Sequence, residues 1–78
     1  MDSYRAVGRA TDMTEREKDV YTFILNYIDI NGYSPSWRDI QKGIYTNSHT
    51  NVKRLIYNLK EKGYIAYTPR TSRSIVVL

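Results

Sequence analysis

Four polar side chains that can donate hydrogen bonds lie close together in the middle of the sequence, at Thr50, Asn51, Lys53 and Arg54. In the major groove of DNA, an asparagine amide pairs with adenine and an arginine guanidinium with guanine, each through two hydrogen bonds. A lysine ammonium is attracted to the neighbouring phosphates. These residue types therefore predict the reading of base edges, with Asn51 and Arg54 as the main base readers. The alternative is an ordinary solvated helix face.

The surrounding residues predict the helix that would present these donors. An apolar stripe with the i, i+3, i+4, i+7 spacing of a buried helix face consists of Val52, Leu55, Ile56 and Leu59. Ser48 is a suitable N-cap, because its hydroxyl can accept a bond from an unpaired backbone N–H. Gly63 is a suitable stop, because glycine adopts the left-handed conformation without a Cβ clash. We expect a helix over about residues 48–62, with the donors on its outer face.

Two helices are expected before this one. The sequence T-E-R-E from Thr14 to Glu17 has the pattern of a capping box, and the apolar helical stripe that follows ends at Gly32. Ser36 is expected to cap a second, shorter helix, and Gly43 to allow the tight turn after it. A short helix, a turn and a helix with a polar outer face follow the order of a helix-turn-helix.

The end of the chain has the pattern of strands. Residues 64–67 and 74–78 are rich in β-branched and aromatic side chains, and the intervening residues 68–73 contain a proline and two arginines. This pattern predicts a two-stranded hairpin with a basic tip, which is a wing; a plain hairpin closing the core is the alternative. The fold class is therefore mostly α with a small β-hairpin, a winged helix-turn-helix.

The remaining DNA contacts are expected on the sugar-phosphate backbone, with the wing lying along it or reaching a minor groove. The residues expected to make them are Trp37, Ser48, Tyr57, Arg70, Ser72 and Arg73.

Charge is distributed unevenly along the chain, whose formal net charge is +4. Residues 1–40 carry five basic and seven acidic side chains, whereas residues 41–78 carry seven basic side chains and one acidic one, Glu61. A basic C-terminal half on a nearly neutral body is typical of a chain that binds a polyanion. The alternative is a basic surface without a specific partner.

Length and composition exclude several other classes of protein. The 78 residues fit one domain over 13–78 with a flexible arm over 1–12. With no cysteine and a single histidine, His49, neither a metal nor a cofactor is expected, and no nucleophile–base pair or carboxylate pair suggests an enzyme. No apolar run approaches the roughly 20 residues of a membrane span, so we expect a cytoplasmic, nucleoid-associated protein.

Two segments resemble a known family. Residues 30–40 read I-N-G-Y-S-P-S-W-R-D-I and residues 55–65 read L-I-Y-N-L-K-E-K-G-Y-I. Both resemble the N-terminal DNA-binding domain of the LexA repressors of the bacterial SOS response, and residues 13–20 and 70–78 are similar to the ends of that domain. The resemblance covers about Met13 to Leu78 and implies a winged helix-turn-helix that binds operator DNA. The base-reading positions that it implies are Ser48, Thr50, Asn51, Lys53 and Arg54.

Two features depart from the family pattern. Lys53 and Arg54 stand where acidic or histidine residues are expected, so the resemblance does not imply the same operator. The sequence ends after the wing, and the resemblance does not extend to the self-cleavage domain that also dimerises LexA. Induction by self-cleavage is therefore not implied, and we expect a stand-alone small regulator from a phage, plasmid or bacterium, or a fragment of a longer protein.

These observations favour a sequence-specific regulator of transcription, and the resemblance favours a repressor. Its expected partner is a double-stranded, palindromic DNA operator, on which a weak homodimer forms. The alternative is a winged helix that binds a host protein, such as the small phage-type proteins that modulate a host repressor or polymerase. The eight tyrosines would suit such an interface.

Overall fold

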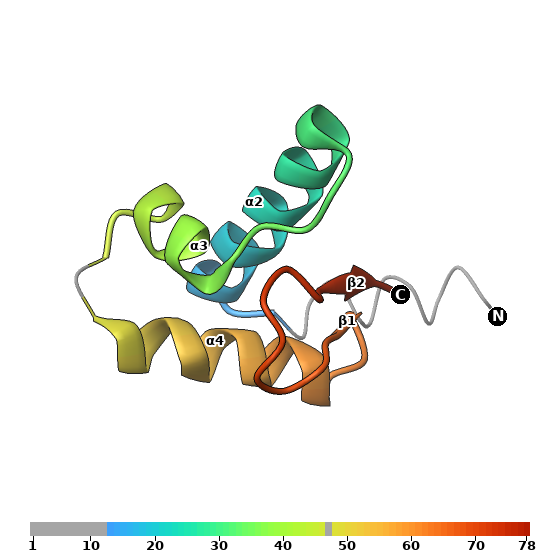
Figure 1. Cartoon of the computed structure of the whole chain (residues 1–78). Helices are drawn as coiled ribbons and strands as arrows, with labels where there is room; N and C mark the ends of the chain where they lie inside the picture. Colours follow the sequence, from blue (N-terminus) through green and yellow to red (C-terminus); the bar gives the residue numbers. More distant parts are fainter. Residues whose placement is uncertain (1–12, 47) are drawn as a thin grey trace, which may run out of the picture.

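A computed structural model describes residues 13–46 and 48–78, and within them the chain forms three helices followed by a short antiparallel hairpin. Helix α2 spans Glu15–Asn31, α3 spans Trp37–Gly43 and α4 spans His49–Glu61, while β1 spans Ile65–Ala66 and β2 spans Val76–Val77. In Figure 1, α4 lies along the lower edge of the molecule with α2 and α3 above it. This arrangement confirms the predicted winged helix-turn-helix class. The predicted arm over residues 1–12 lies outside the described residues, as does Asn47.

The helices begin where the sequence places their caps. The Thr14 hydroxyl accepts a hydrogen bond from the Glu17 N–H at 3.2 Å, and the Glu17 carboxylate accepts one from the Thr14 N–H at 3.1 Å. Ser36 and Asp39 form the same reciprocal pair at the start of α3, at 3.1 and 3.0 Å. Each pair satisfies two backbone donors that a helix start leaves without partners.

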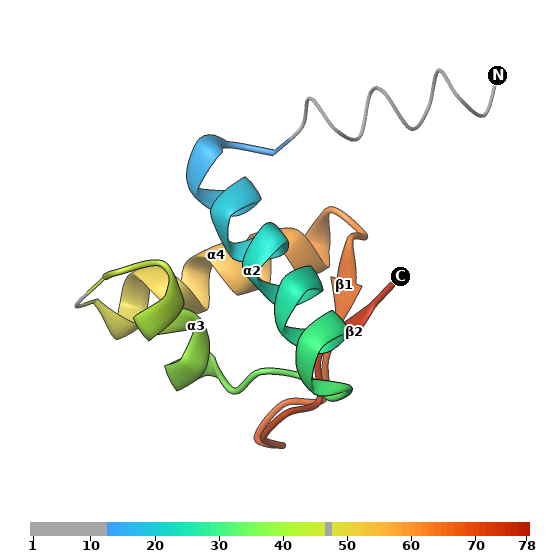
Figure 2. The ribbon, with the colours of Figure 1, turned by 90° about the horizontal axis from the view of Figure 1, so that it is seen from above.

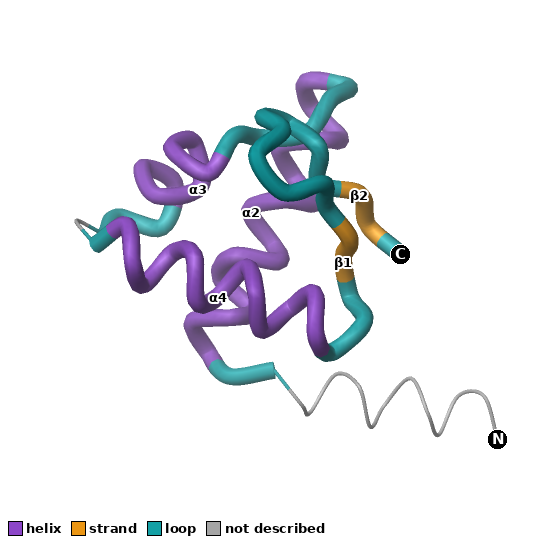
Figure 3. The backbone as a smooth tube through the Cα atoms, turned by 60° about the horizontal axis from the view of Figure 1, so that its bottom comes forward, coloured by secondary structure: helices purple, strands orange, loops and turns teal. Residues whose placement is uncertain are grey.

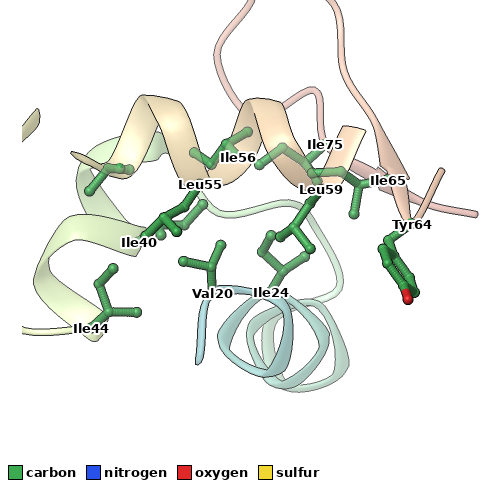
Figure 4. Close-up of a cluster of buried hydrophobic side chains, with 11 residues drawn as sticks. Val20, Ile24, Ile40, Ile44, Leu55, Ile56, Leu59, Tyr64, Ile65 and Ile75 are labelled. Carbon is green, nitrogen blue, oxygen red and sulfur yellow. The ribbon is translucent and has the colours of Figure 1, made fainter. Parts of the chain in front are cut away.

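The core lies between the three helices and one face of the hairpin. Its buried side chains are Val20, Ile24, Ile40, Ile44, Val52, Leu55, Ile56, Leu59, Tyr64, Ile65 and Ile75. In Figure 4, Leu55 and Leu59 point from α4 towards Val20 and Ile24 of α2. Burying an aliphatic side chain of this size contributes roughly 1.5–3 kcal/mol. Because all four predicted stripe residues of α4 are in the core, the opposite face of α4 points outward.

The turn between α3 and α4 is built differently from the expectation. Gly43 does not supply a left-handed residue; Tyr45 does, with φ 56° and an exposed fraction of 94%. The lack of a side chain at Gly43 serves packing instead, because a Cβ there would collide with the Phe23 ring. Gly43 therefore lets α3 approach α2 closely.

The hairpin is shorter than the predicted strands. Its paired residues are Ile65 with Val77 and Ala66 with Val76, in antiparallel register. The ladder ends before the tip because the Thr68 N–H donates to the Ser74 hydroxyl at 3.0 Å, and not to a backbone carbonyl of the opposite strand. Figure 2 shows the wing loop, the segment between β1 and β2, reaching towards the connector between α2 and α3.

Candidate nucleic-acid interface

The first half of α4 presents the predicted donors on its outer face. The Ser48 hydroxyl accepts a hydrogen bond from the Asn51 N–H at 3.1 Å, so Ser48 is the N-cap of the helix. Thr50, Lys53 and Arg54 are exposed and Asn51 is half-buried. In Figure 3, α4 lies on the near side of the molecule, with the wing loop above it. A straight helix with an uncovered polar face matches the width of a major groove.

Asn51 and Arg54 are joined to each other. Arg54 Nη2 donates a hydrogen bond to Asn51 Oδ1 at 2.9 Å, across one turn of α4. The bond leaves the Asn51 Nδ2 donors and the rest of the guanidinium fork for another partner. The two predicted base readers therefore form one hydrogen-bonded pair on the outer face of α4.

An aromatic cluster connects α3, α4 and the wing. Trp37 packs edge-on against Tyr67, with ring centroids 5.4 Å apart. The Lys60 ammonium lies 5.6 Å from the Tyr67 ring centroid and 6.0 Å from that of Tyr57. The predicted backbone contacts Trp37 and Tyr57 thus belong to the same surface. Lys60 and Tyr67 were not predicted; the i, i+3 spacing of Tyr57 and Lys60 is the sequence signal that could have indicated the former.

The tip of the wing is exposed and polar. Arg70 and Ser72 are both exposed, and they line an open cavity of about 260 Å³ together with Trp37, Thr68 and Thr71. The Ser74 hydroxyl accepts a hydrogen bond from the Thr68 N–H at 3.0 Å and lies 2.9 Å from the Thr71 carbonyl oxygen. These bonds organise the loop, so that Arg70 and Ser72 are displayed from an ordered tip.

Arg73 has several partners within the fold. Its Nη1 lies 3.1 Å from Asp39 Oδ2 and donates hydrogen bonds to the Tyr27 hydroxyl and the Ser34 carbonyl, both at 3.1 Å. The predicted backbone contact of Arg73 with DNA remains a prediction. Its geometry differs from that of Arg70, whose side chain has no acidic partner among the described residues.

Ion pairs divide the basic side chains into two groups. Lys62 lies 2.6 Å from Glu17, and Lys60 lies 4.0 Å from Glu61. Within residues 13–46 and 48–78, Lys53 and Arg54 pair with no acidic side chain, as is also true of Arg70. Arg38 and Lys42 of α3 are also exposed and pair with no acidic side chain in this part of the chain. The positive charge that is free for a polyanion therefore lies on α3, at the first half of α4 and at the wing tip.

Two carboxylates in these networks are held in their ionised form. Burial favours the protonated form of Glu17, but hydrogen bonds from Lys62, Thr14 and Asn58 prevail and lower its pKa. The Ser36 N–H lowers the pKa of Asp39, against desolvation, with help from Tyr27 and Arg73. Both carboxylates therefore carry charge at neutral pH and keep their basic partners occupied.

The described part of the chain has neither a cluster of metal ligands nor a helix that could span a membrane. There, no three side chains of His, Cys, Asp or Glu lie close enough to hold a metal ion. None of α2, α3 and α4 is both long and apolar enough to cross a membrane.

Comparisons with known proteins agree with this geometry. The family model described as LexA DNA binding domain matches residues 10–74. The chain is 42% identical to the LexA repressor of Moorella thermoacetica over 67 residues, 86% of this chain and 33% of that protein. It is 46% identical to the LexA repressor of Thermosipho melanesiensis over 66 residues, 81% of this chain and 31% of that protein. The chain thus spans about a third of the length of these curated relatives. It belongs to the family of LexA DNA-binding domains.

Proposed function

We propose that the chain binds a double-stranded DNA operator sequence-specifically and represses transcription. Helix α4 enters the major groove, and the wing lies along the backbone or in the adjacent minor groove. Asn51 and Arg54 read base edges, with Thr50 and Lys53 beside them. Ser48, Tyr57, Arg70 and Ser72 hold the backbone.

The observation that carries the proposal is the division of α4 into two faces. Its apolar face is buried in the core, while its first two turns display Thr50, Lys53 and Arg54 to solvent. The major groove is about 12 Å wide, which admits a helix of about 10–12 Å diameter. The free positive charge at Lys53, Arg54 and Arg70 supplies the attraction to phosphate on which binding depends.

One domain of this size reads a short half-site, so we propose that two copies bind a palindrome. The copies are monomeric or weakly associated in solution and pair on the DNA, which keeps the protein at the nucleoid. Sedimentation of the protein alone and with operator DNA tests this point. A tight dimer at micromolar concentration without DNA would contradict it.

The proposed function is tested by selecting bound fragments from random DNA and footprinting the selected site. The selected sequence should be a palindrome, protected over the major groove of each half. Asn51→Ala should weaken binding to this site while leaving binding to random DNA unchanged. Recovery of no preferred sequence would overturn specific recognition.

A second candidate is a protein-interaction winged helix that modulates a host repressor or polymerase. One observation favours it: an open groove of about 420 Å³, lined by Leu25, Ile28, Tyr33, Ser34, Ile75, Val76 and Val77. Leu25, Tyr33 and Val76 are 41%, 52% and 56% exposed. A gel shift on the gene's own upstream region, beside a pull-down from host lysate, separates the two candidates. A specific host protein and no gel shift would favour the second.

A further inference from the structure

The guanidinium of Arg73 lies inside a cluster built from three parts of the fold. Its Nη1 forms an ion pair with Asp39 of α3 and donates hydrogen bonds to the Tyr27 hydroxyl of α2 and the Ser34 carbonyl of the connector, each at 3.1 Å. Its Cζ lies 5.1 Å from the Tyr33 ring centroid, a cation–π distance. One side chain of the wing therefore contacts both helices that precede α4.

A backbone contact close to Arg73 holds the same part of the wing. The φ of Arg73 is 55°, in the left-handed region that Arg70 also adopts. Next to it, the Ile75 N–H donates a hydrogen bond to the hydroxyl of the buried Ser34 at 3.2 Å. Side chain and backbone together fasten the second half of the wing to the connector between α2 and α3.

The cluster also connects the wing to the helix-turn-helix. Asp39 Oδ2, which pairs with Arg73, accepts the Ser36 N–H at 3.0 Å and so caps α3. Helix α3 in turn packs on α4 through Ile40, which is fully buried in the core. Arg73 and Asp39 therefore connect the wing to α4 through α3, beside the direct contacts of Tyr67 with Trp37 and Lys60.

The charge of Arg73 is already offset within the fold. Asp39 neutralises it, whereas Arg70, three residues earlier on the same loop, has no acidic partner among the described residues. Both arginines are exposed and left-handed, with φ 63° and 55°. They differ in their partners, which makes Arg70 the matched control for Arg73.

We infer that Arg73 is a positioning residue of the DNA interface and not a phosphate contact. It fixes the wing against α2 and α3, so that Arg70 and Ser72 meet the DNA backbone while α4 occupies the groove. This inference rests on the proposed function and replaces the sequence-based expectation that Arg73 holds the DNA backbone directly.

The salt dependence of operator binding distinguishes the two roles. Each neutralised phosphate adds about 0.9 to the slope of log Kd against log salt. Arg70→Ala should therefore lower that slope by about 0.9. Arg73→Ala should weaken binding by about 3- to 10-fold, the scale of ordering a flexible segment, without changing the slope. A slope lowered equally by both substitutions would overturn the inference.

Asp39→Asn should change the affinity for operator DNA in opposite directions under the two roles of Arg73. If Arg73 is a positioning residue, Asp39→Asn weakens binding, and combining it with Arg73→Ala weakens binding no further. If Arg73 contacts phosphate, Asp39→Asn frees the guanidinium, removes a negative charge and tightens binding. The amide keeps an oxygen that can accept the Ser36 N–H, so the cap of α3 is retained.

Trp37, the single tryptophan of the chain, reports on the wing without DNA. Because its ring packs against Tyr67, release of the wing should expose it to acrylamide. Quenching should increase more in Arg73→Ala and Asp39→Asn than in Arg70→Ala, whose side chain lines the cavity beside Trp37. Equal quenching in all three would show that Arg73 does not hold the wing. If circular dichroism shows that Arg73→Ala is unfolded, Tyr27→Phe takes its place, because it removes one hydrogen-bond acceptor of Arg73 without changing charge. The salt slope and the acrylamide quenching of Tyr27→Phe then distinguish the two roles. If quenching increases in Arg73→Ala and Asp39→Asn but the wild-type protein binds no operator, the proposed function is contradicted and the role of Arg73 in holding the wing is not.

Discussion

Arg54 Nη2 donates a hydrogen bond to Asn51 Oδ1 at 2.9 Å, so the two proposed base readers are connected before any DNA is present. The bond restricts the rotamers of both side chains, and less conformational freedom remains to be lost on binding. It also relates the two readouts: an adenine read by Asn51 and a guanine read by Arg54 would lie at neighbouring positions of the site.

Removing either member of this pair should weaken specific binding. Asn51→Ala and Arg54→Ala should each cost about 1–3 kcal/mol on the selected operator, the scale of one bidentate contact. The double variant should cost less than the sum, because each single substitution also releases the other side chain. Titrations of the four proteins on operator and on random DNA measure these differences.

Asn26→Ala is the matched control, because Asn26 is an exposed asparagine on α2, away from α4. It should bind as the wild type does. Equal losses of Arg54→Ala on operator and on random DNA would make Arg54 a phosphate contact.

Two lysines, one within α4 and one at its C-cap, should respond differently to neutralisation. Lys53 has no acidic partner among the described residues, whereas Lys62 is bound to Glu17. Lys53→Gln should lower the salt slope of DNA binding by about 0.9 and leave thermal stability unchanged. Lys62→Gln should do the reverse, lowering the melting temperature with no change in slope. A lowered slope in Lys62→Gln would place that lysine at the DNA.

The local elements of this protein could be predicted from the sequence because their signals are local. The capping boxes at Thr14 and Ser36, the stripe of α4 and the stop at Gly63 each depend on residues a few positions apart. The partnerships of Arg73 and Lys62 could not be predicted, because Tyr27 and Glu17 lie 46 and 45 positions away. The sequence pattern indicates that these side chains are basic, while the packing of α2 against α4 and the wing determines which of them remain available to DNA.

Glu17 should make the stability of the domain sensitive to acid. Its carboxylate is almost fully buried and accepts bonds from Lys62, Asn58 and the Thr14 N–H at 2.6, 3.1 and 3.1 Å. Because these partners lower its pKa in the folded state, the unfolded chain takes up the proton first as the pH falls. The stabilisation is therefore complete above the ordinary carboxyl range and is lost as the pH falls through the lowered pKa.

Glu17→Gln tests this account by thermal unfolding across that acid range. The variant should be less stable at neutral pH by about 1.5–3 kcal/mol, the scale of hydrogen bonds to a charged group. Its stability should also fall less steeply with acid than that of the wild type. Glu15→Gln, which neutralises an exposed glutamate of the same helix, should follow the wild-type curve. An unchanged acid dependence in Glu17→Gln would assign the pH sensitivity to another group.

The close approach of α3 to α2 at Gly43 predicts a contact-specific loss of stability. Gly43→Ala should destabilise the fold by about 1–3 kcal/mol, as overpacking of a core does, because the added Cβ collides with Phe23. Phe23→Leu in the same chain should recover part of this loss, which thermal or urea unfolding of the four proteins measures as a coupling energy. Gly32→Ala is the control, since Gly32 is left-handed at φ 78° but has open space around it. Its loss should come from backbone strain alone and should not couple to Phe23→Leu. Equal coupling at both glycines would show that the ring contact is not the cause.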